Sequence, residues 1–218
     1  MIKNKLTINT LKAEAHEFAI IESNSVSPIL YGVTDGKRVG TYLEHKFQEF
    51  LHTKYLYDEG SSAKGLDFPS LNVDMKVTSI KQPQSSSPFK SARQKIYGLG
   101  YSLLIFVYEK FDNHTNKTGE LKILHTIFVE EYRTGDFQTT SGLRNIINNE
   151  GNIDDILAFF EERRLPLDEI QAQDLAEYVL SNIPEVGYLT ISNALQWRLQ
   201  YSRVIQEAGS VMGIQKVL

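Results

Sequence analysis

The 218-residue sequence contains no cysteine, which excludes disulfide bonds and zinc sites built from thiolates. It also lacks an apolar run long enough to cross a membrane, and its first residues lack the apolar region of a signal peptide. We therefore expect a soluble, cytoplasmic protein that does not associate with membranes. The hydrophobic fraction of 41% and the charged fraction of 23% are typical of a globular protein with one sizeable core.

Net positive charge is lacking as well, since the formal net charge is −4, and this at first argues against a nucleic-acid partner. The charges are unevenly distributed, however. Lysine and arginine outnumber acids over residues 60–110, whereas acids dominate residues 146–185. A local basic surface can bind phosphates even on an acidic protein, although ordinary scatter of surface charge also produces such a pattern.

A predicted hairpin is the most informative feature of the sequence. Two short β-type runs, residues 65–68 and 72–79, flank a Pro-Ser-Leu sequence that is typical of a tight turn. A hairpin closed there places Asp67 opposite Asp74, and carboxylates that face each other at about 5 Å repel. A divalent cation between them would remove the repulsion, and Mg²⁺ prefers such hard oxygen ligands.

The second strand of this hairpin adds a basic group. Side chains alternate along a strand, so Lys76 shares a face with Asp74, and the apolar Val73, Met75 and Val77 form the opposite face. Two carboxylates can hold Mg²⁺ on a phosphate, where the metal lowers the pKa of a water and the lysine offsets developing charge. Asp-x-Lys is also a common tripeptide, and a structural cross-strand ion pair is the alternative. The polar loop, helix and buried strand that follow favour the catalytic interpretation.

This pattern resembles the PD-(D/E)xK nuclease superfamily, in particular the type II restriction endonucleases. Asp67-Phe68-Pro69 matches the first acid of the motif, although the proline follows the acid here, and Asp74-Met75-Lys76 matches the (D/E)xK element. The resemblance covers roughly residues 38–110 and implies Mg²⁺ as cofactor, with Mn²⁺ as a substitute. The implied metal ligands are the carboxylates of Asp67 and Asp74 and the backbone carbonyl of Met75.

The resemblance also implies a fold and a further site residue. We expect an α/β fold with a restriction-endonuclease-like mixed β-sheet core flanked by helices, and with a helical C-terminal part. Residues 1–140 would form the nuclease core with the catalytic hairpin, and residues 141–218 a helical subdomain packed on it. An amphipathic helix over residues 39–57 carries Glu44, which the family would place near the site, whereas a solvent-exposed glutamate is the alternative. Restriction enzymes of this size usually act as homodimers on palindromic sites.

Polar and basic side chains that follow the hairpin are candidates for contact with double-stranded DNA. The loop expected over residues 80–88 is rich in amide and hydroxyl groups, and glutamine can form two hydrogen bonds with adenine, although an exposed Ser/Pro loop is the alternative. Residues 89–98 are expected to form a basic helix, in which Gln94 has a minor supporting role. A last helix, over residues 190–208, would either read DNA in a helix-turn-helix or pack in the core or a dimer interface. The candidates are Lys81, Gln82, Gln84, Ser85, Ser86, Ser87, Lys90, Arg93, Gln94, Asn193, Arg198 and Arg203.

The sequence therefore predicts a type II restriction endonuclease that uses Mg²⁺ to hydrolyse phosphodiester bonds at a specific sequence in double-stranded DNA. Three alternatives remain at this point: a structure-specific repair or recombination nuclease, a non-catalytic helix-turn-helix DNA-binding protein, and a protein whose Asp/Lys face is only structural. Metal-dependent cleavage separates the two nucleases from the others.

Overall fold

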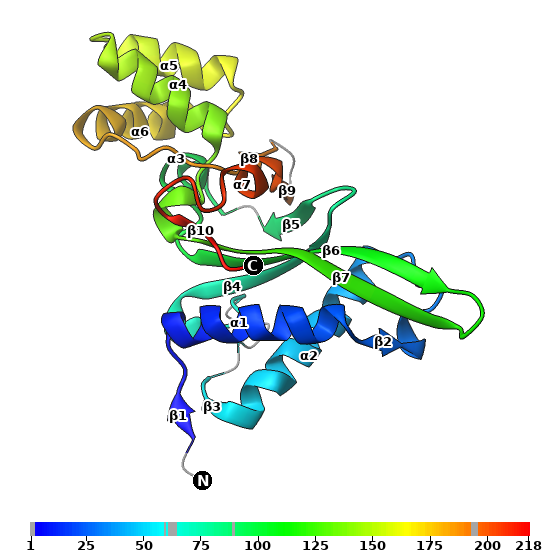
Figure 1. Ribbon diagram of the computed structural model, residues 1–218. Coiled ribbons are helices and arrows are strands. Elements are labelled where there is room, and N and C mark those ends of the chain that lie inside the picture. The colour runs from blue at the N-terminus through cyan, green and yellow to red at the C-terminus, as the bar shows by residue number, and fades with distance from the viewer. Residues whose placement is uncertain (1–2, 59, 61–64, 89, 193–195) are drawn as a thin grey trace. The chain divides into compact units, whose positions relative to one another are not determined.

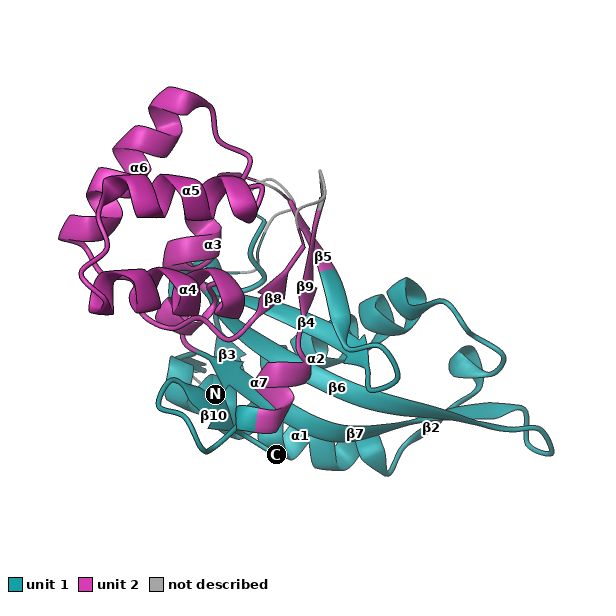
Figure 2. Cartoon of the chain, turned by 90° about the horizontal axis from the view of Figure 1, so that it is seen from above, with its two compact units in different colours: residues 1–85, 102–129, 207–218 teal, residues 86–101, 130–206 magenta. Residues whose placement is uncertain are grey.

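The computed structural model describes residues 3–58, 60, 65–88, 90–192 and 196–218. These residues form two compact units, which Figure 2 colours teal and magenta. The chain passes from unit 1 to unit 2 and back twice. No helix in the described ranges is long and apolar enough to cross a membrane. Unit 1 consists of residues 1–85, 102–129 and 207–218, and unit 2 of residues 86–101 and 130–206.

A mixed β-sheet forms the centre of unit 1 (Figure 1). Its strands follow the order β10–β7–β6–β4, and β2 also pairs with β7. Strand β4 pairs with β6 in parallel, whereas the other pairs in this sheet are antiparallel. The structure thus confirms the predicted mixed sheet. The strands are β2 (Val26–Ser27), β4 (Val73–Ser79), β6 (Ser102–Asn113), β7 (Thr118–Val129) and β10 (Ile214–Lys216).

Two long helices, α1 (Ile8–Ser23) and α2 (Gly36–Lys54), cover one face of this sheet (Figure 1). Helix α2 was expected from apolar residues at helical spacing, and Val39, Leu43, Phe47 and Leu51 of that row are buried. Aromatic rings join the layers: the Phe47 ring centroid lies 5.1 Å from that of Phe18 on α1 and 5.2 Å from that of Phe106 on β6. The short strands β1 (Asn4–Lys5) and β3 (Tyr55–Leu56), which adjoin the two helices in sequence, pair with each other in parallel.

Unit 2 is mainly helical and has its own hydrophobic core. Residues 141–206 of the expected helical part lie in this unit and contain most of its helices. Asn152 is the N-cap of the helix Ile153–Glu162, since its side chain accepts hydrogen bonds from the backbone N–H groups of Asp154 and Asp155. The helices are α3 (Arg93–Tyr97), α4 (Phe137–Asn148), α5 (Ile153–Glu162), α6 (Glu169–Ser181) and α7 (Ser202–Glu207), which ends just past the unit boundary.

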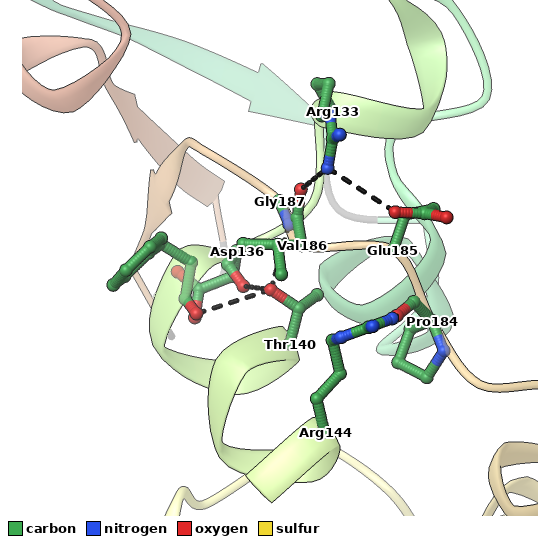
Figure 3. Close-up of polar contacts among 9 residues, drawn as sticks. Arg133, Asp136, Thr140, Arg144, Pro184, Glu185, Val186 and Gly187 are labelled. Atoms are coloured by element: carbon green, nitrogen blue, oxygen red, sulfur yellow. Dashed lines mark hydrogen bonds and ion pairs between the residues drawn. The ribbon is translucent and has the colours of Figure 1, made fainter. Parts of the chain in front are cut away.

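The connection after α6 is tied to α4 by polar contacts (Figure 3). Arg144 donates a hydrogen bond of 2.8 Å to the carbonyl of Pro184, and the backbone N–H of Gly187 donates one of 2.9 Å to the hydroxyl of Thr140. Gly187 also lies directly against the backbone of Gly135, where a Cβ atom would come within 2.2 Å of the carbonyl carbon. Only glycine fits this position without a backbone shift.

The predicted last helix, over residues 190–208, is wrong. The chain there forms the strands β8 (Thr190–Ile191) and β9 (Gln196–Gln200) before the short helix α7. Along β9 the buried Trp197 and Leu199 alternate with the exposed Arg198 and Gln200, which is the period of a strand. The helix-turn-helix alternative therefore fails, because no recognition helix forms among the described residues of this segment.

Two neighbouring expectations were also wrong in part. The polar segment after β4 does not remain a loop throughout, because its second half forms strand β5 (Gln84–Pro88), which pairs with β9. The helix expected over residues 89–98 is confined to α3. The partner strand that satisfies the backbone of β5 lies more than a hundred residues further along the chain, so local sequence patterns do not reveal it.

Candidate active site

The hairpin closes as the sequence predicts. A 3₁₀ turn follows Phe68, whose backbone exchanges two hydrogen bonds with Val73, at 3.0 and 3.2 Å. Asn72 ends this turn in the left-handed conformation, with φ of 55°, which asparagine tolerates better than most residues. Because Phe68 faces Val73 in an antiparallel bridge, Asp67 lies opposite Asp74.

The two carboxyl groups are in hydrogen-bonding contact. One oxygen of Asp67 also accepts a hydrogen bond of 2.7 Å from the backbone N–H of Met75. Burial, then the hydrogen bond with Asp74 and then the charge of Asp74 raise the pKa of Asp67 to about 7, although the Met75 N–H opposes the shift. Without a cation the pair therefore holds a proton up to neutral pH, and a bound cation would have to displace that proton.

Lys76 completes the group on the same strand. Its ammonium lies 2.7 Å from a carboxylate oxygen of Asp74, and only 6% of the Asp74 side chain is exposed. On the opposite face of β4, Val73 and Met75 are fully buried in the core of unit 1, and Val77 packs against it, as predicted. The strand thus presents carboxylate and ammonium together on one face, although the catalytic and the structural interpretation both include this ion pair.

Glu44 on α2 belongs to the same electrostatic environment. Burial raises the pKa of its half-buried carboxyl, while the charge of Lys76 lowers it and that of Asp74 raises it. The structure thus brings Glu44 within electrostatic reach of the hairpin groups. This placement comes from the packing of α2 beside β4.

The donors at the hairpin suit Mg²⁺, which typically takes one or two protein carboxylates and keeps its remaining positions for water and substrate phosphate. Asp67 and Asp74 offer such a pair, since a cation would relieve both their repulsion and the cost of burying them. Within the described part of the chain, no group of three or more histidine, cysteine or acidic side chains is placed to hold a metal. Among the described side chains, a cation here would therefore depend on these two carboxylates.

The candidate DNA contacts of unit 1 lie just after β4. Lys81 and Gln82 are exposed, whereas Gln84 and Ser85 are half-buried. Thr78 orders this segment, since its hydroxyl accepts a hydrogen bond of 2.9 Å from the backbone N–H of Gln84. The sequence alone does not single out Thr78, because one threonine near the end of a strand carries no distinctive pattern.

The candidates of unit 2 differ in exposure. Ser86, Lys90, Arg93 and Arg198 are exposed, and Asn193 lies outside the described residues. Three others make internal contacts. Ser87 is buried with its hydroxyl 3.4 Å from that of Tyr101, Gln94 donates a hydrogen bond to the carbonyl of Leu99, and the Arg203 guanidinium lies 3.6 Å from the ring centroid of Phe137.

Comparison with known proteins places the chain in a family. The family model described as "Type II restriction enzyme NspV" matches residues 5–216. The type II restriction enzyme NspV of Nostoc sp. (strain ATCC 29411 / PCC 7524) is 62% identical over 212 residues, which cover 97% of this chain and 96% of that protein. A crystal structure of the tetrameric restriction endonuclease SfiI bound to cognate DNA aligns with 99% of this chain and 88% of its own, at 9% identity and a TM-score of 0.37. The family match and the identity to NspV confirm the predicted type II restriction endonuclease, and the chain belongs to the NspV family of type II restriction enzymes.

Proposed function

We propose that the hairpin of Asp67, Asp74 and Lys76 is the active site at which this restriction enzyme hydrolyses a phosphodiester bond of double-stranded DNA. Mg²⁺ is the proposed cofactor, and Mn²⁺ a substitute. The observation that carries the proposal is the contact of the buried Asp74 carboxyl with the half-buried Asp67 carboxyl, whose pKa is raised to about 7, beside an ammonium at 2.7 Å. A purely structural ion pair does not need the second carboxyl group.

Each side chain has a distinct role in this proposal. Asp67 would release its proton to solvent when a cation binds, and Asp67 and Asp74 would hold that cation, with the backbone carbonyl of Met75 as a further ligand. The cation would supply positive charge that polarises the phosphate and acidifies a water. Lys76 orients that water or stabilises the charge that develops on the phosphate oxygens in the transition state. Burial raises the pKa of Glu44, which makes its carboxylate a better proton acceptor than that of an ordinary exposed glutamate.

The DNA contacts are proposed for the exposed polar residues after the hairpin. Lys81 and Gln82 follow the catalytic strand directly, and Ser86 and Arg198 are exposed on β5 and β9, strands of one sheet. Strand residues can reach base edges in the major groove as helices do. We therefore propose that β9, in place of the expected recognition helix, presents Arg198 to DNA.

We further propose that the enzyme acts as a homodimer in the cytoplasm, where its DNA substrate lies. A two-fold symmetric enzyme presents two equivalent hairpins to the two strands of a palindromic site. Sedimentation with and without a palindromic duplex would test this. A monomer in both conditions would contradict it.

The test of the active site compares matched substitutions at two Asp/Lys pairs. Asp74→Asn and Lys76→Met should each abolish cleavage while leaving the fold intact, because both side chains lie on the face of β4 opposite the core residues Val73 and Met75. Asp112 and Lys110, two residues apart on β6, also form an ion pair, so Asp112→Asn and Lys110→Met are the controls and should cut like the wild type. Wild-type cleavage by Asp74→Asn would refute the assignment.

A further inference from the structure

Unit 2 contains a cavity of about 500 Å³ whose lining includes two basic side chains. Lys90 and Arg93 line it together with Asp174, Leu175 and Tyr178 of α6. Lys90 and Arg93 are exposed, so a ligand in solution can reach both. Asp174 is the acidic residue of this lining, and no ion pair joins it to either cation within the described structure.

Two aromatic rings hold the Arg93 side chain in place. Its guanidinium carbon lies 3.8 Å from the ring centroid of Tyr178 and 5.0 Å from that of Tyr97. The rings meet edge to face, with centroids 5.3 Å apart, and the Tyr97 hydroxyl donates a hydrogen bond of 2.7 Å to the carbonyl of Asn182. Arg93 is thus stacked on a ring that is itself fixed by its neighbours.

Stacking occupies the face of a guanidinium and leaves its edge, which carries the N–H donors, available. Among the residues that the structure describes, no hydrogen bond or ion pair uses the donors of the Arg93 side chain. The planar fork of arginine matches two oxygens of a phosphate, and holding the side chain in advance lowers the entropy lost on binding. Lys90 supplies a second positive charge to the same cavity, which favours a charged phosphate over a neutral base edge.

We propose that Arg93, stacked on Tyr178, binds a backbone phosphate of the DNA duplex together with Lys90, and that Tyr178 is the positioning residue of this contact. The inference rests on the proposed function of cutting double-stranded DNA and adds a binding site to it. Tyr178 itself touches no DNA in this arrangement. It lies in the range 146–185, in which acids outnumber basic residues.

The test measures DNA binding by fluorescence anisotropy in Ca²⁺, on a cleavable duplex and on a scrambled duplex, over a range of salt concentrations. Arg93→Ala should weaken binding to both duplexes by about tenfold and lower the slope of log K against log salt by about 0.9, the value for one lost phosphate contact. Arg93→Lys should keep the slope but weaken binding, because it retains the charge without the fork. Arg164→Gln is the control, since it removes an exposed arginine of unit 2 outside this cavity.

Two substitutions distinguish the role of the Tyr178 ring from that of its hydroxyl. Tyr178→Leu should weaken binding to both duplexes, Tyr178→Phe should restore the wild-type value, and the double variant with Arg93→Ala should bind no worse than Arg93→Ala alone. Unchanged affinity and salt slope in Arg93→Ala would overturn this inference. A loss of affinity confined to the cleavable duplex would also overturn it, because it would show that Arg93 contacts a base edge. Wild-type protein that fails to bind or cut any duplex would instead overturn the proposed function.

Discussion

Replacing Asp67 by asparagine should stabilise the metal-free protein at pH 8. In the wild type the Asp67 carboxyl is ionised at pH 8, although it is largely buried and contacts Asp74. Asparagine has the shape of the protonated acid. Its carbonyl oxygen can accept the hydrogen bond from Met75, and its amide can donate to Asp74.

The size of the effect follows from the pKa of Asp67, which rises from its ordinary value of 3.8 to about 7 in the folded protein. Between these values the native state holds a proton that the unfolded state has lost, so this carboxyl lowers wild-type stability as the pH rises through that window. The difference between the two values corresponds to about 4 kcal/mol for a fully dry group. Water reaches the half-buried Asp67, so we expect the substitution to raise the free energy of unfolding at pH 8 by about 1 to 2 kcal/mol, which corresponds to about 2 to 8 °C in melting temperature.

Thermal melts in chelator, from pH 4 to pH 8, measure this effect. The Asp67→Asn variant should melt above the wild type at pH 8, and the gap should narrow as the pH falls towards 4. Added Mg²⁺ should raise the melting temperature of the wild type but not that of the Asp67→Asn variant. Asp112→Asn is the control, because Lys110 lowers the pKa of that acid and its substitution should bring no gain. An Asp67→Asn protein that melts below the wild type at pH 8 without metal would refute the reasoning.

Three further predictions follow from the same structure. Cleavage should require Mg²⁺ or Mn²⁺, whereas Ca²⁺ should support binding without cutting because its looser coordination positions the reactants poorly; cutting in excess chelator would contradict this. Gln82→Ala should weaken binding to the cleavable duplex more than to a random duplex, because contacts with bases give sequence specificity whereas contacts with phosphates only position the protein. Equal losses of affinity on both duplexes would show that Gln82 contacts the DNA backbone. Gly187→Ala should lower the free energy of unfolding, measured by denaturant titration, by about 2 kcal/mol, because the added Cβ would lie 2.2 Å from the Gly135 backbone. Gly36→Ala is the control and should have little effect, because a Cβ at Gly36 has no neighbour within 4 Å.

The hairpin was predictable because everything that builds it is local. The turn sequence fixes the register between Asp67 and Asp74, and strand alternation then assigns Lys76 to their side. What the sequence does not reveal is the environment of these groups. The raised pKa of Asp67 depends first on burial, which comes from packing that no local pattern encodes.

The errors lie where distant segments meet. The apolar residues around Trp197 fit helical spacing as well as strand spacing, and pairing with β5 decides for the strand. The stack of Arg93 on Tyr178 joins residues 85 positions apart in sequence, so neither residue signals the other. Such partners become visible only once the chain is folded.

Mapping the ends that the protein produces on DNA of known sequence, in Mg²⁺ and with Asp74→Asn alongside, tests the central claim most directly. The account predicts discrete ends at one recurring sequence for the wild type, and uncut DNA for the variant and for the wild type in chelator. Discrete ends that persist in Asp74→Asn would show that the enzyme cuts at a site other than this hairpin.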